Sequence, residues 1–502
     1  MTGILAFGAG IPARRLALAL LAGREGPMPA SAPARTVAWA DEDAVTLAVQ
    51  AARECLQGVD RAGVDLLLFA STTAPFAEKQ SAAIVAAVLG LSPRVRTVDV
   101  AASLRGGTQA LQLALDAVRA GSARSALVIA ADCREGAPGS ALEANGGDAA
   151  VALLVGEGDV LVEVAGAATH TQEIVDVWRR PADRFAHTWE ERFVIAQGYQ
   201  EPVQEAVRAL AANMANARSA DDLPVEEGAL RDGLRNSAEG GADSHFDHLV
   251  LSAPDARAHA ALATRVASGA KVADALFGRV GACGAAHALL QLAFLAESAA
   301  AGERALLLNH GDGADALALR FLRPAPARVA PALAVGIPVP SMKLFRVARE
   351  QVAQEWAGHD YQGISATVHF REREENLALC GQRCACGVPQ FPRGRICAAC
   401  GAHDRFTPEC FAERGATLLS FTLDHFFPTP EPPTAVGVVQ IDDGPRMYLQ
   451  LADIDPAALR PDANGIPALQ PGVRLRLVFR RIHTVGGRPN YFWKAVSAEA
   501  GS

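Results

Sequence analysis

Five of the nine cysteines lie between Cys380 and Cys400, and four of them form two close pairs. The pairs are Cys384 with Cys386 and Cys397 with Cys400. Two cysteine knuckles about a dozen residues apart can close a tetrahedron of thiolates, which is the geometry of structural zinc. In a reducing compartment such a cluster indicates a metal site more than disulfides. We therefore expect these four cysteines to hold a structural zinc ion.

The first of these pairs is short. Only one residue separates Cys384 from Cys386, so the loop strains ligation of one metal ion by both sulfurs. Cys380 is then an alternative ligand, and a metal-free segment is the third outcome. The remaining cysteines are scattered and are expected to be buried as small hydrophobic residues: Cys55, Cys133, Cys283 and Cys410.

A glycine-rich turn carries the strongest candidate for a general base. It reads Asn309-His310-Gly311-Asp312-Gly313, and an imidazole titrates near neutrality without special tuning. The competing interpretation of His310 is a hydrogen-bonded structural group. Cys283, in the turn Val280-Gly281-Ala282-Cys283, is a candidate nucleophile, although a small buried thiol is the simpler explanation.

A further candidate segment is both aromatic and charged. It reads His187-Thr-Trp-Glu-Glu-Arg-Phe193 and is followed by Tyr199. We favour a helix that docks on the core with a solvated charged face, and keep His187 and Glu190 as candidate site residues.

The elements that must position these groups follow an alternating pattern up to about residue 322. Residues 65–70 and 125–131 are continuous apolar runs that suit strands buried on both faces. Residues 42–56 read as a helix, and residues 106–121 read as a helix that is apolar all round and hence buried. This alternation is typical of a layered α/β domain.

The α/β region also contains an internal repeat. The segment that begins at Gly107 (Gly-Thr-Gln-Ala-Leu-Gln-Leu-Ala-Leu) is echoed from Ala286 (Ala-His-Ala-Leu-Leu-Gln-Leu-Ala-Phe-Leu), and each copy is followed by a glycine-rich turn and another strand. An offset of roughly 180 residues indicates two similar halves, because solenoid repeats are much shorter.

The rest of the chain is different in character. Residues 219–245 are acidic and glycine-rich, which predicts a solvent-exposed insertion. Residues 324–340 form a proline-rich linker, and a helix is expected over 341–356. Beyond the cysteines, five short strand-like runs predict a small antiparallel barrel: 416–423, 435–441, 446–451, 474–480 and 490–496.

The segment Val98-Asp-Val-Ala-Ala-Ser-Leu-Arg-Gly-Gly-Thr-Gln-Ala-Leu111 resembles the nucleophile turn of the thiolase superfamily, in particular of 3-hydroxy-3-methylglutaryl-CoA synthases and type III ketoacyl synthases. In those proteins a cysteine stands where this chain has Leu104, at a helix N-terminus that lowers the thiol pKa. Leucine cannot accept an acyl group. The resemblance implies a duplicated thiolase-like αβαβα fold, coenzyme A as part of the substrate, and a homodimer paired through central sheets.

The resemblance also locates three further catalytic positions, and each is changed here. The general-base glutamate falls in the turn Ala70-Ser71-Thr72-Thr73, which has no carboxylate, although Glu78 lies nearby and is kept as a candidate. The catalytic histidine is replaced by Ser252 and the asparagine by Ala282. Together with Leu104, these changes remove the usual Claisen machinery.

The cysteine-rich segment from Cys380 to Gly401 resembles the zinc ribbon that precedes the OB-fold in the DUF35 family of acyl-CoA-associated proteins. The implied organisation is a first thiolase-like half (1–163), a second half (164–323), a linker and helix (324–375), a zinc ribbon (376–413) and an OB-fold (414–502). The barrel's rings and arginines are expected to pack on the first domain or on the nucleotide end of coenzyme A: Phe426, Phe427, Tyr448, Tyr491, Phe492, Trp493, Arg480, Arg481 and Arg488.

Composition excludes several other classes. The formal net charge is −8, which provides no basic field for nucleic acid. No apolar run approaches the roughly 20 residues that cross a bilayer, and the first ten residues read as a strand and turn instead of a signal peptide. We expect a cytoplasmic protein that binds neither nucleic acid nor membrane.

A retained fold without its cysteine has three possible functions. The first is an enzyme that makes or breaks a C–C bond of an acyl-CoA without an acyl-enzyme, as in retro-aldol cleavage. Thiolase-like aldolases with OB-fold partners are similar in arrangement, but they rely on tyrosines that Tyr199 and Tyr361 do not obviously match. The second is an acyltransferase or synthase with a relocated nucleophile. The third is a non-catalytic acyl-CoA-binding scaffold subunit for a cysteine-bearing thiolase-like partner.

Overall fold

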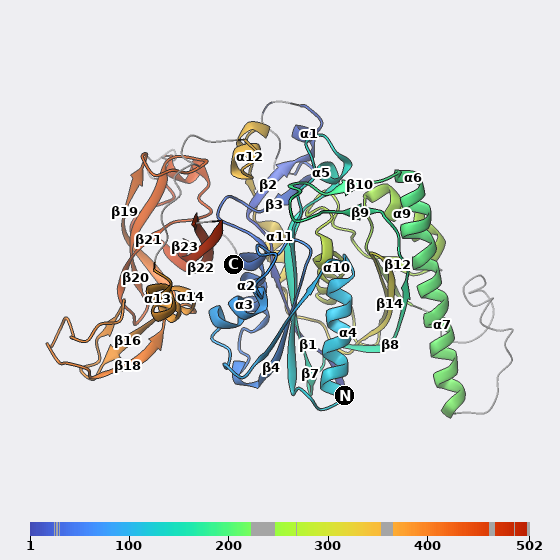
Figure 1. Cartoon of the computed structure of the whole chain (residues 1–502), viewed down its shortest axis with the longest axis horizontal. Helices are drawn as coiled ribbons and strands as arrows, with labels where there is room; N and C mark the ends of the chain where they lie inside the picture. The colour runs from blue at the N-terminus through green and yellow to red at the C-terminus, as the bar shows by residue number, and fades with distance from the viewer. Residues whose placement is uncertain are drawn as a thin grey trace.

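A computed structural model describes residues 1–24, 26, 29, 31–221, 246–267, 269–352, 365–460, 467–485 and 487–498. A larger α/β domain and a smaller β domain lie side by side (Figure 1). The predicted insertion at 219–245 falls outside the described residues, except for positions 219–221 at the end of a long helix.

The α/β domain contains a ten-stranded sheet whose two halves have the same strand order. The first half runs β1 (Thr2–Gly10), β7 (Asp148–Glu157), β6 (Ser125–Cys133), β4 (Val64–Ser71) and β5 (Arg96–Ala101). The second half runs β8 (Val162–Thr171), β14 (Gly313–Phe321), β13 (Arg304–His310), β11 (His248–Leu251) and β12 (Lys271–Val272). The halves join where Ile4 of β1 pairs with Val162 of β8. The predicted duplication is therefore confirmed.

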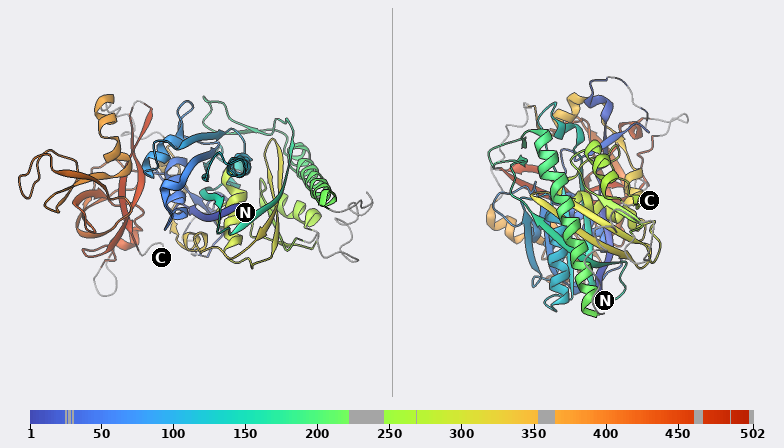
Figure 2. Two further views of the ribbon diagram at one scale, coloured as in Figure 1. Left: turned by 90° about the horizontal axis from the view of Figure 1, so that it is seen from below. Right: turned by 90° about the vertical axis from the view of Figure 1, so that its right-hand side faces the viewer.

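Helices cover both outer faces and fill the space between the two half-sheets (Figures 1 and 2). The outer layers are α2 (Ala44–Cys55) with α3 (Ser81–Val88), and α7 (Glu201–Asp221) with α9 (Ala256–Val266). The central layer is α4 (Gly106–Arg119) with α10 (His287–Ala296). Five layers result, as expected for αβαβα packing. α4 lies in the middle of the domain as predicted, but it is not buried on every side, because Leu113 is 52% exposed and Asp116 also faces solvent.

Shorter elements complete the α/β domain. They are β2 (Arg14–Ala17), α1 (Leu18–Leu21), β3 (Ala34–Val37), η1 (Arg61–Gly63), α5 (Ala141–Asn145), β9 (Val177–Trp178), β10 (His187–Thr188), α6 (Glu191–Phe193), the π-helix η2 (Val194–Gln200), η3 (Gly284–Ala286) and α11 (Val329–Ala334).

The linker contacts the first domain. Its strand β15 (Ile337–Pro338) pairs with β2. The following helix α12 (Met342–Ala348) starts where the Ser341 hydroxyl accepts a hydrogen bond from the Leu344 N–H, as a helix cap should. It is shorter than predicted because the chain turns at Glu350, which has a φ of 56°. Positions 353–356 of the predicted helix lie outside the described residues.

The C-terminal part begins with α13 (Ala366–Arg371) and α14 (Arg373–Ala378), followed by a small sheet of β16 (Cys380–Cys384), β17 (Pro389–Gln390) and β18 (Phe406–Cys410). All five predicted barrel strands are present: β19 (Gly415–Asp424), β20 (Thr434–Ile441), β21 (Arg446–Gln450), β22 (Arg474–Val485) and β23 (Arg488–Ser497), with the one-turn helix η5 (Pro456–Leu459) before β22. Their order is β21-β20-β19-β22-β23, and a bridge from Leu451 to Ala495 nearly closes the barrel.

The barrel docks on the outer layer formed by α2 and α3. Arg53 of α2 donates to the Leu477 carbonyl at 2.6 Å and lies 5.0 Å from the centre of the Trp493 ring. The Tyr491 hydroxyl donates to Asp43 at 2.8 Å, and buried Arg480 pairs with Glu42 at 3.1 Å. These groups meet the expectation of packing on the first domain. Phe426 and Tyr448 do not, since they are 98% and 68% exposed on the barrel surface.

Candidate functional site

The turn around Leu104 joins β5 to α4 and is held by the opposite half of the domain. Leu104 is half-buried, and the next residue, Arg105, is buried. The Arg105 guanidinium donates to the Gly311 carbonyl, to the Asp312 carbonyl at 2.8 Å and to the Asp315 carboxylate at 3.2 Å. Gly311 adopts a φ of +142°, and a Cβ there would lie 2.9 Å from the Cβ of Leu104. The first-half turn and the second-half glycine turn therefore pack directly on each other.

Asp315 organises the floor of this site. Its carboxylate accepts from Thr108 at 2.5 Å and from Thr169 at 2.9 Å, in addition to Arg105. The Asn309 amide donates to the Thr108 hydroxyl at 3.1 Å and to the Leu104 carbonyl at 3.4 Å. Asn309 thus links β13 to the Leu104 turn and to α4 through hydrogen bonds.

His310 and Ser252 are in direct contact. The Ser252 hydroxyl lies 2.9 Å from Nδ1 of His310 and 2.7 Å from the Asn309 side-chain oxygen, and it accepts the His310 backbone N–H at 3.1 Å. Burial, then the neighbouring His287 and Arg134, lower the pKa of His310 to about 3. The imidazole is therefore neutral at physiological pH, with Nδ1 occupied by Ser252. The serine that replaces the family histidine is the residue that orients His310.

Tyr199 was not assigned to this site from the sequence. Its ring packs edge-on against His310, with centroids 4.9 Å apart. The residue is 1% exposed. Its hydroxyl has no hydrogen-bond partner within the part of the chain that the structure describes.

Cys283 lies at the start of η3, before α10, and is completely buried. Its sulfur lies 3.6 Å from Nδ1 of His287. Burial raises the pKa of the Cys283 thiol, with a smaller contribution from Asp132 in the same direction. Burial likewise lowers the pKa of His287 to about 4. The pair therefore remains a neutral thiol and a neutral imidazole, which supports the interpretation of Cys283 as a buried small residue.

Asp132 links the turn after β4, at residues 71–73, to η3 before α10, and no local sequence pattern points to it. Its side chain accepts from the Thr72 N–H at 2.7 Å and the Thr73 hydroxyl at 2.8 Å, and from the Ala285 N–H at 2.8 Å. The residue is fully buried. The turn that lacks the family glutamate is thus held by a carboxylate from the neighbouring strand β6.

Three predicted residues lie elsewhere. Glu78 is exposed in the loop between β4 and α3. His187 lies in the β9–β10 hairpin, stacked 5.6 Å from the Trp178 ring and 3.3 Å from the Asp183 carboxylate. Glu190 is exposed. Within the described residues, no hydrogen bond, ion pair or ring contact joins Glu78, His187 or Glu190 to Leu104, Ser252 or His310.

A surface hollow of about 410 Å³ lies where β4 and β5 end. Its walls include Ser71 and Phe76 on one side and Asp99 and Ala101 on the other. β5 is an edge strand of the sheet, and Val98 on it is 41% exposed. The hollow therefore lies on the strand that leads into the Leu104 turn.

The four predicted zinc ligands converge. Their sulfur atoms all lie within 4.8 Å of one another, with Cys384 to Cys400 and Cys386 to Cys397 at 3.7 Å each. Zinc–sulfur bonds of about 2.3 Å in a tetrahedron place the sulfurs about 3.8 Å apart, so the residues fit the ion. The short Cys384–Cys386 loop does not prevent this arrangement.

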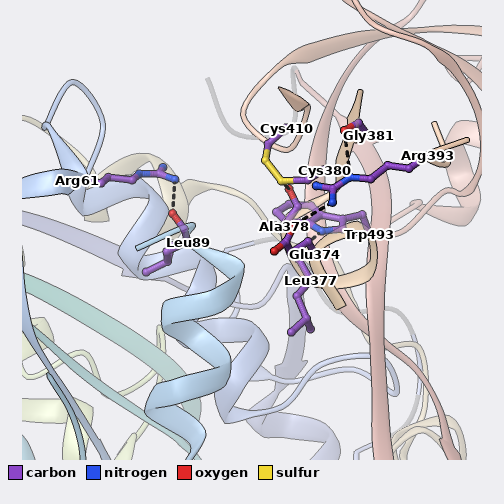
Figure 3. The surroundings of a disulfide bond; sticks show 10 residues. All are labelled: Arg61, Leu89, Glu374, Leu377, Ala378, Cys380, Gly381, Arg393, Cys410 and Trp493. Atoms are coloured by element: carbon purple, nitrogen blue, oxygen red, sulfur yellow. Dashed lines mark hydrogen bonds and ion pairs between the residues drawn. A yellow bond between two sulfur atoms is a disulfide. The ribbon is translucent and has the colours of Figure 1, made fainter. Parts of the chain in front are cut away.

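Cys380 is not a member of this cluster. It forms a disulfide with Cys410 across β16 and β18 (Figure 3). The predictions that Cys380 is an alternative ligand and that Cys410 is a buried free residue are wrong, since Cys410 is exposed and bonded. Beside the disulfide, the Trp493 indole donates to the Leu377 carbonyl at 2.9 Å (Figure 3). The disulfide thus lies where the small sheet meets the barrel.

The chain is similar to two different groups of known proteins, one for each domain. A family model for the C-terminal OB-fold domain of ChsH2 matches residues 411–480. Hydroxymethylglutaryl-CoA synthases of Methanosphaera stadtmanae and Methanocella arvoryzae are 31% and 33% identical over 193 and 217 residues, which are 37% and 41% of this chain. The chain spans 56% and 61% of the length of those relatives.

A solved structure of MvaS in complex with 3-hydroxy-3-methylglutaryl coenzyme A superposes with a TM-score of 0.58 at 23% identity, covering 70% of this chain and 92% of that one. This likeness shows the fold of the first domain. No helix within the described ranges is long and apolar enough to span a bilayer.

Proposed function

We propose that this chain, which joins a thiolase-superfamily domain of the HMG-CoA synthase type to a C-terminal OB-fold domain of the ChsH2 type, binds an acyl-CoA and makes or breaks a C–C bond in it without an acyl-enzyme. Retro-aldol cleavage of a β-hydroxyacyl-CoA is the reaction that needs least from the protein. It requires a base for the hydroxyl and stabilisation of the thioester enolate, but no thiolate.

The contact between Ser252 and His310 carries this proposal. Burial lowers the pKa of His310 to about 3, so the imidazole is neutral and has a free nitrogen over the whole physiological range, although the lowered pKa makes it a weaker base than a free imidazole. Ser252 fixes its Nδ1, so Nε2 is the nitrogen that remains for a substrate. His310 directly precedes Gly311, and Gly311 packs on Leu104. Leu104 stands where the resembling synthases have their nucleophilic cysteine.

A relocated cysteine nucleophile is less well supported. Cys283 is completely buried and its thiol pKa is raised, so little thiolate forms. We therefore assign the chemistry to proton transfer.

The test is turnover by the purified full chain with panels of β-hydroxyacyl-CoA and β-ketoacyl-CoA esters. The expected result is cleavage of β-hydroxyacyl-CoA with no acyl adduct in the intact protein mass. His310→Asn should reduce the rate by about 10²–10⁴-fold, the range typical for loss of a general base. His425→Asn, a matched change at an exposed loop histidine of the barrel, should not.

The second candidate is a non-catalytic acyl-CoA-binding subunit for a cysteine-bearing thiolase-like partner. The unpaired edge of β5, with its adjacent hollow, favours it, because a neighbouring sheet can pair there. A homodimer through this edge is the default, and the same edge accepts a related partner. Absence of turnover in both panels, together with an adjacent gene for a cysteine-bearing thiolase-like protein, would support this role.

The four clustered cysteines hold a structural zinc ion in this proposal. Zinc would fix the ribbon beside the barrel, as the sulfur positions allow. Elemental analysis of the purified protein should give about one zinc per chain. Cys397→Ser should lose it, whereas Cys133→Ser, a matched change in the first domain, should retain it.

A further inference from the structure

We propose that Tyr199 is the second acid–base group of the site: its phenol donates a proton to Cα of the acyl-CoA, while His310 accepts the proton of the β-hydroxyl. This inference rests on the proposed function and assigns the step that His310 alone leaves open, which is protonation of the enolate carbon.

The starting observation is a buried phenol without a partner. Tyr199 is 1% exposed, and its oxygen has no hydrogen-bond partner among the described residues. Tyr491, which is also buried, shows the usual arrangement, because its hydroxyl donates to Asp43 at 2.8 Å. An unpaired buried hydroxyl is unfavourable, so a ligand atom that hydrogen-bonds Tyr199 removes the penalty that this hydroxyl carries.

The second observation is the contact with His310. The two rings lie 4.9 Å apart at 71°, so phenol and imidazole belong to one enclosed group. Tyr199 stands in the π-helix η2 between α6 and α7. Such helices are rare and are found often at functional sites.

Burial fixes the resting protonation states of the two residues. Burial, and then Asp255, raise the pKa of Tyr199, so the phenol keeps its proton. Burial, and then His287 and Arg134, lower the pKa of His310, so the imidazole stays free to accept one. At neutral pH the pair therefore consists of a protonated phenol and a neutral imidazole, which are the starting protonation states that the proposed step requires.

The proton balance closes within the pair. His310 takes the hydroxyl proton, the Cα–Cβ bond breaks, and its electron pair moves toward the thioester carbonyl to give an enolate. The aldehyde or ketone product leaves. The enolate then takes the phenol proton at Cα, and His310 returns its proton to the phenolate. Both residues end in their starting states, and no oxidant or further reactant is consumed.

The experiment compares full-length wild type with Tyr199→Phe and with Tyr448→Phe, the same change at a 68% exposed tyrosine of the barrel. Three quantities are measured: cleavage of β-hydroxyacyl-CoA, incorporation of deuterium from D₂O at Cα of a saturated acyl-CoA, and the unfolding temperature. Tyr199→Phe should lower cleavage and exchange by about 10²–10⁴-fold. Its unfolding temperature should be equal or higher, because the substitution removes the unpaired hydroxyl. Tyr448→Phe should match wild type in all three.

The outcomes separate the two levels of inference. If wild type cleaves and Tyr199→Phe cleaves and exchanges equally well, the role of Tyr199 is overturned and the proposed function stands. Loss of both activities together with a lower unfolding temperature would also overturn it, because that pattern indicates a structural tyrosine. If wild type neither cleaves nor exchanges, the proposed function fails and this inference fails with it.

Discussion

Each half of the α/β domain has a turn before its central helix, and the two turns occupy equivalent positions. Comparing them shows that an equivalent position does not give a residue the same reactivity. In the internal repeat, Leu104 precedes α4 as Cys283 precedes α10, about 180 residues later. The first half, whose turn corresponds to the nucleophile turn of the resembling synthases, has Leu104 at this position. The second half has a thiol, Cys283, at the equivalent position. Leu104 is half-buried, whereas Cys283 is completely enclosed.

Environment decides what a thiol at either turn can do. Cys283 contacts a neutral histidine and has a raised pKa, so equivalence to the nucleophile position does not make it a nucleophile. The second half instead supplies His310, Ser252 and Asn309 to the site at the interface, and the first half supplies the turn on which they pack. In the proposed function, the second half is therefore the reactive half and the first half supports it.

The largest expected effect comes from placing a thiol at the first-half turn. Leu104→Cys puts it at the N-terminus of α4, where the helix dipole favours thiolate. Iodoacetamide at neutral pH should label the introduced thiol at least about 100-fold faster than Cys283 in the same protein, as measured by peptide mass mapping. Equal rates at the two positions would show that the turns do not differ in environment.

Replacing the buried carboxylate Asp315 of the second half should lower the free energy of unfolding more than replacing the buried carboxylate Asp132 of the first half. Asp315 pairs with buried Arg105, whereas the recorded partners of Asp132 are neutral hydroxyl and N–H groups. Asp315→Asn leaves a buried guanidinium without its counter-charge and should cost about 3–5 kcal/mol. Asp132→Asn should cost less, about 1–3 kcal/mol, since it disturbs hydrogen bonds and a longer-range attraction to buried Arg134 but no direct ion pair within the described residues. Calorimetric unfolding of the two variants checks the order, and the reverse order would contradict it.

The close packing between halves gives a third prediction. Gly311→Ala forces a Cβ to within 2.9 Å of Leu104 and should cost about 2–4 kcal/mol from strain and overpacking. Gly302 also has a positive φ, 93°, but no atom lies within 4 Å of an added Cβ. Gly302→Ala should therefore cost about 1 kcal/mol. The difference between their unfolding temperatures isolates the packing contribution, and similar shifts would indicate that the turns are not in contact.

Sequence patterns predicted the elements better than the site. Leucine-rich runs and the repeat indicated the strands and the duplication, because burial on both faces of a sheet leaves a strong signal. The cysteine spacing indicated the four clustered sulfurs. The patterns did not indicate the contact between Tyr199 and His310 or the hydrogen bonds from Thr72, Thr73 and Ala285 to Asp132. Each of these interactions connects residues that are far apart in the sequence and meet only in the folded chain. The Cys380–Cys410 disulfide likewise joins residues that are distant in sequence.

The smallest expected effect is the acid sensitivity of the second half. The pKa values of His287 and His310 are lowered to about 4 and 3 from an ordinary 6.5, so the folded state keeps both neutral while the unfolded chain takes up protons. Stability is then fully present above pH 6.5 and falls as the pH drops toward 4. The corresponding helix start of the first half carries Thr108, which does not titrate in this range. Unfolding temperatures between about pH 8 and pH 5 should fall less steeply for His287→Asn than for wild type, and His425→Asn, at an exposed position, should keep the wild-type slope. An unchanged slope in His287→Asn would show that His287 is not one of the acid-sensitive groups.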